Sequence, residues 1–382
     1  MSELEYLERH SLSWRTLLLL ICGFVFSSCS SFSDESLEQK LQKVLDKGVK
    51  KYNVRGVSAA IVFDADSIWI GTSGISYDTV SMKSDMLFGI GSVTKNFVAA
   101  LTLKLVENGS LSLEDKLSKW LPAYPYIDSN ITIRQLLNHT SGIYMFWNND
   151  NLWDALIKDR TRIWTPEEVL EYIKEPHFLP GESWGYSNTN YLLMAMIIEK
   201  ATGSTLSLGF KKYLWKPLNL QNYYLWLANS IPENQAHVFG DNFLHGSSEM
   251  DLTFLPRASH ESITFGSSGI VTTAIDLARW CYYLYEGNIL IENSMDKMLQ
   301  FIEFKPVSNM RGYGLGVQIF TPNIVHGEYA IGHGGGNIGS ATYMVYLPKY
   351  HSSVVVMVNA FPTNSVDYFT NGLIKEFIKF SD

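Results

Sequence analysis

The segment Phe88–Lys95, which reads FGIGSVTK, holds a serine and a lysine at a spacing suited to nucleophilic catalysis. Glycines interrupt the chain before Ser92, and the apolar pattern that follows predicts a helix from Lys95 to Asn108. Because residues three apart share a helix face, the Lys95 amine can reach the Ser92 hydroxyl. A desolvated lysine can take the hydroxyl proton, and the positive helix end favours an oxyanion beside it. The pair therefore predicts acylation of Ser92.

A second candidate is the triplet Tyr186-Ser187-Asn188, which follows a turn and precedes a helix predicted over residues 189–201. Loop residues at such a position can point into a cleft. Tyr186 can then carry a proton, and Asn188 can donate a hydrogen bond to a substrate. Considered without Ser92, the alternative is favoured: Tyr186 packs the turn and Asn188 is the N-cap of the helix.

The third candidate is the glycine-rich segment that begins at His333 and follows a predicted strand. Missing side chains at Gly334, Gly335 and Gly336 let a substrate backbone lie close to the strand, and the Gly336 N–H can serve as an oxyanion donor. The same segment matches the dinucleotide fingerprint G-x-G-x-x-G. That motif must open a helix after an early strand, whereas here another strand follows, so no nucleotide cofactor is expected.

Two other patterns limit the interpretation. The segment Ser294–Lys297 repeats the serine-lysine spacing without a glycine entry, and we interpret it as a surface helix. No H-E-x-x-H pair occurs in the chain, so a metallohydrolase is a poor alternative and no metal is expected.

Taken in order, S-x-x-K at Ser92, Y-x-N at Tyr186 and H-x-G at His333 resemble the three motifs of the serine β-lactamase and penicillin-binding-protein superfamily. The resemblance is to its class C-like branch, which includes D-alanyl-D-alanine carboxypeptidases and esterases, and it runs from Leu37 to the end of the chain. It implies that Ser92 attacks a carbonyl and that an acyl-enzyme is then hydrolysed. It also implies an oxyanion site between the N–H groups of Ser92 and Gly336.

The resemblance assigns further roles around these motifs. His139, in the matching stretch LLNHTSG, is expected to be structural, and His333 is expected to orient Tyr186 and the substrate. Asn188, Gly335 and Gly336 are expected to contact the substrate. Whether Lys95 or Tyr186 takes the serine proton stays open at this point.

One departure from the superfamily pattern limits the substrate. Many relatives carry Thr or Ser where this chain has Gly334, which removes a hydroxyl that helps to bind a substrate carboxylate. A carboxypeptidase or esterase is therefore favoured over an efficient β-lactamase. The leading hypothesis is hydrolysis of a peptide (D-alanyl-D-alanine type), ester or β-lactam carbonyl in the cell envelope. The alternative is a sensor or scaffold that binds penicillin or cell-wall peptides with little turnover.

The elements that must position these residues form an α/β (α+β) fold. Helical spacing predicts a helix over 37–52, and short β-branched runs predict a hairpin over 57–71. Strands are predicted over 313–320, 329–332, 341–347 and 353–358, with a closing helix over 366–380. We expect both chain ends to share one antiparallel sheet flanked by helices, forming a lobe of residues 33–91 and 305–382. A mainly helical subdomain, 92–304, is inserted between them.

The remaining features concern location and partners. The 382 residues carry a net charge of −8 without a basic cluster, so nucleic acid is not an expected partner. Residues 1–32 resemble an export signal, because two arginines precede the short apolar run Leu17–Phe26. This predicts a monomer in the periplasm or cell envelope that acts on a small-molecule or peptide substrate. Cys29 ends a box similar to that of lipoproteins and can carry a membrane-anchoring lipid; ordinary cleavage near Ser30 is the alternative. Only Cys281 remains in the folded domain, as a buried thiol.

Overall fold

The computed structural model describes residues 35–52, 54–240, 250–361 and 364–381. The chain divides into two units, Met1–Gln39 and Lys40–Asp382, and the architecture below is that of the second unit. The export signal predicted over residues 1–32, including Cys29, lies outside the described residues. No helix in the described ranges has the length and apolar character that a membrane span requires.

A nine-stranded antiparallel sheet joins the two ends of the second unit, in the order β3-β2-β1-β14-β13-β12-β11-β10-β9. Its strands are β1 Gly56–Val62, β2 Ile68–Tyr77, β3 Val80–Ser81, β9 Ile302–Val307, β10 Met310–Tyr313, β11 Gln318–Phe320, β12 Ile331–Asn337, β13 Ser340–Leu347 and β14 Ser352–Val358. Strands β1 and β14 pair in the register Val57 opposite Val358. Both strands are buried along their whole length, as their β-branched residues favour. The predicted α/β (α+β) class with a shared antiparallel sheet is confirmed.

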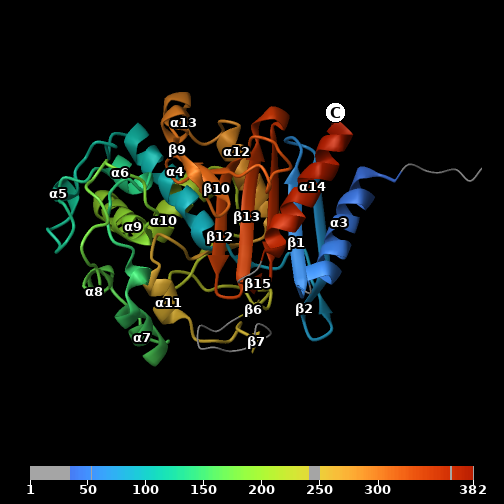
Figure 1. The fold of residues 1–382 in the computed structure, drawn as a ribbon, viewed down its shortest axis with the longest axis horizontal. Helices are drawn as coiled ribbons and strands as arrows, with labels where there is room; N and C mark the ends of the chain where they lie inside the picture. Colours follow the sequence, from blue (N-terminus) through green and yellow to red (C-terminus); the bar gives the residue numbers. More distant parts are fainter. Residues whose placement is uncertain (1–34, 53, 241–249, 362–363, 382) are drawn as a thin grey trace, which may run out of the picture. The chain divides into compact units, whose positions relative to one another are not determined.

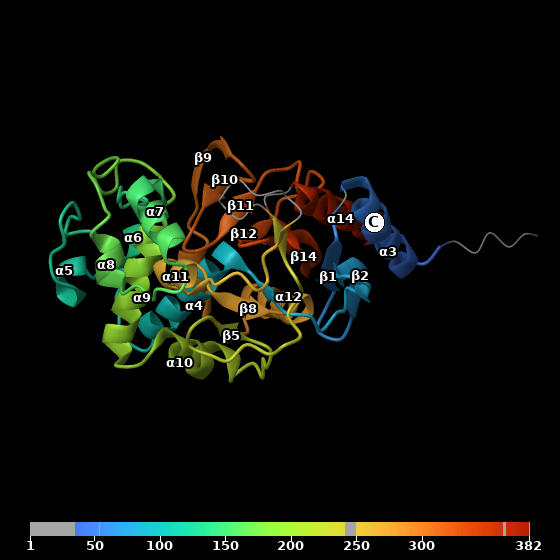
Figure 2. The same cartoon turned by 90° about the horizontal axis from the view of Figure 1, so that it is seen from below.

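Three long helices cover this sheet: α3 Leu37–Tyr52, α12 Ala274–Tyr285 and α14 Ser365–Ser381. Helix α12 lies on one face, where Ser353 Oγ donates to the Ala278 carbonyl over 2.8 Å, and α14 lies on the other face with α3 beside it (Figures 1 and 2). The approach of α3 and α14 is close, because a Cβ at Gly48 would lie 2.1 Å from the Phe369 ring. Cys281 is buried in α12, and its burial raises the pKa of the thiol, as suits a structural residue.

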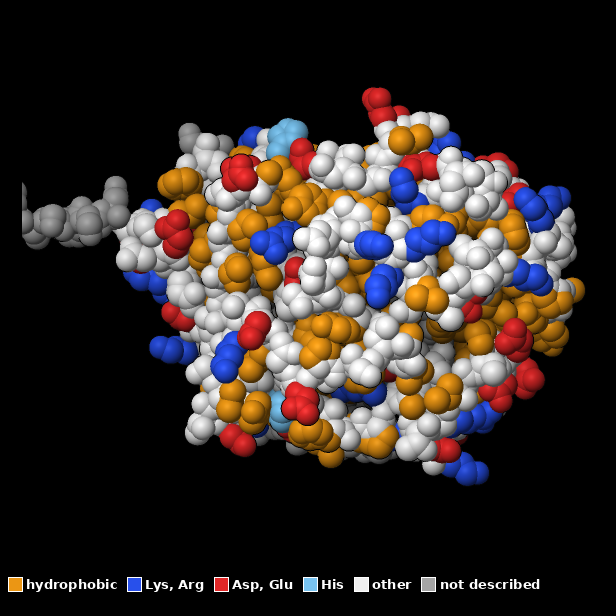
Figure 3. Space-filling model, turned by 180° about the vertical axis from the view of Figure 1, so that it is seen from behind, with side chains coloured by type: hydrophobic (Ala, Val, Ile, Leu, Met, Phe, Trp, Pro, Cys, Tyr) orange, Lys and Arg blue, Asp and Glu red, His pale blue; other side chains and the backbone are white. Residues whose placement is uncertain are grey.

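The inserted part is mostly helical and gathers beside the sheet (Figure 1). Its helices are α4 Thr94–Glu107, α5 Leu117–Trp120, α6 Ile133–Leu137, α7 Asp150–Lys158, α8 Pro166–Leu170, α9 Asn188–Thr202, α10 Leu206–Phe210, α11 Ala258–Ile263 and α13 Glu292–Met298, with short turns η1 Gly91–Val93, η2 Phe146–Asn148 and η3 Lys211–Trp215. A further turn, η4 Pro348–Tyr350, links β13 to β14. Two small sheets, β4-β8-β5 and β15-β6-β7, connect the parts; their strands are β4 Phe88–Gly89, β5 Tyr224–Leu225, β6 Phe239–Gly240, β7 Met250–Asp251, β8 Ile270–Thr272 and β15 Ala360–Phe361. On the face seen in Figure 3, basic side chains are interspersed with acidic and hydrophobic ones.

Two predicted strands differ from the structure. The continuous strand predicted over 313–320 is wrong, since Tyr313 ends β10 and Gln318 begins β11. A turn separates them, closed by a 2.7 Å hydrogen bond from Gly314 N to Val317 O and containing Gly316 at φ +68°. The strand predicted over 329–332 begins later, at Ile331, and runs through the glycines to Asn337. The glycine-rich segment therefore belongs to a sheet strand.

Candidate active site

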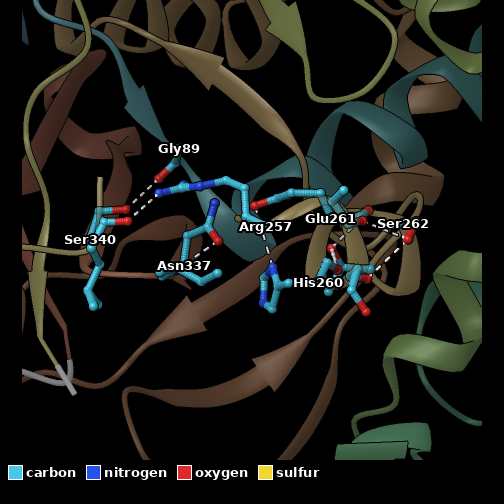
Figure 4. Close-up of polar contacts among 12 residues, drawn as sticks. Gly89, Arg257, His260, Glu261, Ser262, Asn337 and Ser340 are labelled. Atoms are coloured by element: carbon cyan, nitrogen blue, oxygen red, sulfur yellow. Dashed lines mark hydrogen bonds and ion pairs between the residues drawn. The ribbon is translucent and has the colours of Figure 1, made fainter. Parts of the chain in front are cut away.

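Ser92 sits in the 3-10 turn η1, directly before α4. The strand that leads into this turn is held from two sides. Gly89 pairs with Val271 of β8, and its carbonyl accepts a 2.9 Å hydrogen bond from Ser340 Oγ of β13 (Figure 4). The backbone before Ser92 is thus attached to both the small sheet and the large one, which fixes where the hydroxyl lies.

Lys95 lies in the first turn of α4 and is fully buried. Its Nζ donates to Ser92 Oγ over 2.9 Å and to the Ser267 carbonyl over 2.9 Å. The rings of Tyr186 and Tyr191 lie 4.9 Å and 5.6 Å from the same Nζ. Burial lowers the pKa of Lys95 well below its usual range, because the charged form loses its hydration. This places an amine that can be neutral next to the serine hydroxyl.

Tyr186 approaches the same hydroxyl from the loop before α9, and both residues line the same cavity. Burial raises the pKa of the Tyr186 phenol well above its usual value, and the nearby Ser92 side chain offsets this only in part. At neutral pH the phenol therefore keeps its proton. The two pKa values are shifted in opposite directions, so Lys95 can be neutral and is available to accept a proton, whereas Tyr186 stays protonated and is available to donate one.

His139 holds the loop that carries Tyr186. Its carbonyl accepts a 3.0 Å bond from Gly185 N, and its Nδ1 accepts a 3.2 Å bond from Ser187 N. Asn190 Nδ2 lies 3.0 Å from the same Nδ1. Because a backbone N–H can only donate, Nδ1 carries no proton. Burial also lowers the pKa of His139 well below its usual range, so the ring is neutral and its contacts make it a positioning residue.

The η1 turn packs against β12 at two glycines. A Cβ at Gly91, where φ is +54°, would lie 2.3 Å from the Gly336 carbonyl oxygen, and a Cβ at Gly335 would lie 2.1 Å from the Ile90 carbonyl oxygen. The same Cβ at Gly335 would lie 3.0 Å from Ser92 N. Only glycine permits this approach of the two backbones. It brings the Ser92 N–H beside Gly335 and Gly336, where the second oxyanion donor is expected.

His333 uses both ring nitrogens within the protein. Nδ1 donates to the Gly334 carbonyl over 2.6 Å, because that oxygen can only accept, and Nε2 then accepts from the Tyr313 hydroxyl over 2.8 Å. Burial, together with the charge of Lys95, lowers the pKa of His333 to about 3. The ring is neutral, and its hydrogen bonds go to Tyr313 and Gly334. The expectation that His333 orients Tyr186 and the substrate stays a prediction. Tyr313, the partner of His333, packs edge-on against Tyr186 with the ring centres 6.2 Å apart.

A cavity of about 480 Å³ opens at these residues. Its wall is formed by Ser92, Tyr186, Ser308, Asn309, Met310, Gln318, Asn323, Ile324, His333, Gly334, Gly335, Gly336, Ala341, Tyr343, Phe361, Asn364, Val366 and Asp367. The structure thus brings Ser92, Tyr186, His333, Gly335 and Gly336 to one space, with Lys95 behind Ser92.

Asn188 was expected to contact the substrate, but it is not part of this wall. It is the first residue of α9, and its backbone N–H donates to Met145 Sδ over 3.0 Å. Its side-chain oxygen is buried and has no partner among the described residues. The geometry supports the substrate-contact prediction less well for Asn188 than for Gly335 and Gly336.

Some functional groups escaped the sequence analysis. The Ser267 carbonyl that binds Lys95 has no side-chain signature, and no role was predicted for Tyr313, the hydrogen-bond partner of His333. The segment that carries Ser267 follows α11. In α11 the buried Glu261 lies 3.4 Å from His260 Nδ1 (Figure 4). Burial lowers the pKa of the neighbouring Arg257, and the charge of Glu261 opposes this shift.

Comparison with known proteins agrees with this arrangement. The family model described as Beta-lactamase matches residues 41–378, and the chain belongs to that family. Penicillin-binding protein 4* of Bacillus subtilis is 29% identical over 73% of this chain and 62% of its own length. Esterase EstB of Burkholderia gladioli is 29% identical over 55% of this chain and 57% of its own length. The chain therefore spans about three fifths of these two relatives.

Solved structures share the fold. A D-stereospecific amidohydrolase from Streptomyces sp. superposes with a TM-score of 0.72 and 29% identity, covering 86% of this chain and 96% of that one. The shared fold places this chain in the superfamily that its three motifs resemble, and the predicted family is confirmed.

Proposed function

We propose that this protein is a serine hydrolase that forms an acyl-enzyme on Ser92 from an ester, amide or peptide carbonyl. The observation that carries the proposal is the 2.9 Å contact between Ser92 Oγ and the fully buried Nζ of Lys95. The names of its relatives, a penicillin-binding protein, an esterase and a D-stereospecific amidohydrolase, support acyl chemistry of this kind.

In the proposed mechanism the neutral Lys95 amine takes the Ser92 proton as Oγ attacks the carbonyl carbon. The resulting oxyanion accepts hydrogen bonds from the N–H groups of Ser92 and Gly336. Tyr186 then gives its proton to the leaving group and regains one from Lys95, so that one proton has passed from the serine to the leaving group. Water attacks the ester on Ser92, and its proton returns to the serine by the reverse route.

We further propose that the substrate lies in the cell envelope. This rests on the export signal predicted over residues 1–32, with lipid attachment at Cys29 or ordinary cleavage near Ser30 as the two routes. Bacterial fractionation of the wild type and of Cys29→Ala distinguishes these two routes. Loss of the membrane-bound fraction in the variant is expected for a lipid anchor, and an equal distribution of both proteins contradicts one.

The catalytic proposal is tested by intact-mass spectrometry after treatment with a fluorophosphonate and, separately, with a penicillin. One fluorophosphonate adduct is expected on the wild type and none on Ser92→Ala. Ser294→Ala is the matched control, because Ser294 and Lys297 have the same spacing, yet α13 carries them away from the cavity. Labelling that survives Ser92→Ala contradicts the proposal. A penicillin adduct that persists without turnover indicates a sensor.

A further inference from the structure

One end of the catalytic cavity is built from residues that no motif marks. Asp367 in the first turn of α14, Tyr343 of β13 and Asn309 in the β9–β10 turn line the same space as Ser92. The Tyr343 hydroxyl donates to Asp367 Oδ1 over 2.7 Å, and the Asn309 side chain lies near enough to Tyr343 to lower the pKa of its phenol, against the larger effect of burial. A carboxylate is therefore held in place at the cavity wall by a hydrogen bond from Tyr343.

This group occupies the place where a carboxylate-binding hydroxyl would stand. A Cβ at Gly334 would lie 2.7 Å from Asn309 Nδ2 and 2.9 Å from the Tyr343 ring. A Ser or Thr side chain at this position would therefore displace both neighbours. Tyr343 and Asn309 fill the space beside Gly334, and Tyr343 holds Asp367 at the same end of the cavity.

The formal charges of the residues that line the cavity are a second observation about Asp367. Among the described residues that line the cavity, Asp367 is the one that carries a formal charge at neutral pH, since His333 is neutral. No basic side chain in the described ranges forms an ion pair with Asp367. Burial raises the pKa of the Asp367 carboxyl, although the bond from Tyr343 opposes the shift. A desolvated carboxylate of this kind is stabilised by a cation and repels a second anion.

We propose that Asp367 makes this end of the cavity a cation subsite, which binds an ammonium group on the leaving part of the substrate. The inference rests on the proposed function and specifies its substrate class. In a peptide ending in D-alanine the leaving group carries a carboxylate, and Asp367 would repel it. The preferred substrate is therefore an ester or amide whose leaving alcohol or amine bears a positive charge.

The experiment compares three phenylacetyl esters that share one acyl group. Their leaving alcohols are choline (cationic), 3,3-dimethylbutanol (neutral and of the same shape) and 3-hydroxypropanoate (anionic). The wild type is expected to hydrolyse the choline ester with a kcat/KM about 10-fold above the neutral ester and about 100-fold above the anionic ester. In Asp367→Asn the three values should converge, while the value for the neutral ester changes less than about 3-fold.

Glu376→Gln is the matched control, because it removes a carboxylate from the same helix without touching the cavity. A purely structural role of Asp367 at the helix start would lower all three values together and leave their ratios intact. That outcome, or a choline preference that survives Asp367→Asn, overturns the proposal while the hydrolase function stands.

A separate binding measurement distinguishes failure of the function from failure of the subsite. If no ester is hydrolysed in a Ser92-dependent way, the proposed function fails and calorimetry with tetramethylammonium on the full chain decides about the subsite. Binding that is lost in Asp367→Asn but kept in Glu376→Gln supports it. No binding to the wild type overturns it.

Discussion

Lys95 Nζ and Ser92 Oγ lie 2.9 Å apart across the junction between the 3-10 turn η1 and helix α4. The amine is fully buried, and its second hydrogen bond goes to the Ser267 carbonyl. A carbonyl offers no negative charge to retain a proton on the amine. These contacts therefore favour a neutral Lys95 beside Ser92, with consequences for the acylation rate and for its dependence on pH.

Replacing Lys95 by Arg should lower the acylation rate by about 10²- to 10⁴-fold, since a guanidinium does not lose its proton in proteins. The measurement is the rate of fluorophosphonate or ester labelling by stopped flow. Lys104→Arg is the control, because Lys104 lies on the same helix and pairs with Glu107 at 2.6 Å. A Lys95→Arg variant with wild-type rates would exclude lysine as the base.

The pH dependence has a defined direction. Because burial lowers the pKa of Lys95, the neutral base persists to lower pH than a free lysine allows. The acylation rate should be constant above this lowered pKa and should fall as pH drops through it. A pH profile of kcat/KM that rises only near the pKa of a free lysine would contradict this reading.

Tyr186→Phe should affect amides more than activated esters. The raised pKa keeps the phenol protonated, so its role is to protonate the leaving group. A p-nitrophenolate leaves without that proton, whereas an amine does not. We expect a loss of about 10²-fold or more for an anilide and about 10-fold or less for the p-nitrophenyl ester of the same acid. Equal losses on both substrates would show that Tyr186 has another role.

Gly91→Ala should separate the two oxyanion donors. The new methyl group would meet the Gly336 carbonyl oxygen at 2.3 Å and push β12 away from Ser92. Loss of one donor corresponds to a fall in kcat of about 10²- to 10³-fold. Gly109→Ala is a matched control, because Gly109 also has a positive φ, +77°, but has nothing within 4 Å of the added Cβ. If both variants lose activity equally, backbone strain is the cause and the donor geometry is not.

His333 should make stability depend on pH. Its pKa is about 3 in the folded protein, against about 6.5 in an unfolded chain. The folded state therefore binds fewer protons, and the stability from the neutral ring, complete above pH 6.5, is lost as pH falls toward 3. Between pH 7 and pH 5 the loss is about 2 kcal/mol.

The test is urea unfolding of the wild type and of His333→Gln at both pH values. The variant lacks the titrating ring. The free energy of unfolding of the wild type minus that of His333→Gln should therefore be about 2 kcal/mol smaller at pH 5 than at pH 7. His139 is present in both proteins, and burial is the largest cause of its lowered pKa, so most of its contribution is common to both. An unchanged difference would mean that His333 is not held neutral in the folded state.

Much of the fold followed from local patterns. Helical spacing predicted helices over 37–52 and 366–380, and the structure has α3 at Leu37–Tyr52 and α14 at Ser365–Ser381. The error at 313–320 has a local cause as well. The apolar residues there are buried on both sides of a turn, and burial pattern alone does not reveal that the chain reverses at Gly316.

Ser92 and Lys95 could be found from the sequence because helical geometry brings residues three apart together, wherever the helix lies. Their order with Tyr186 and His333 was sufficient for the family. The protonation states depended on tertiary structure, since desolvation requires neighbours from distant segments, such as Ser267 over Lys95 and Tyr313 on His333. The same holds for the cavity's charge: Asp367 reaches Tyr343 only because α14 folds back onto β13, and no local pattern encodes that contact.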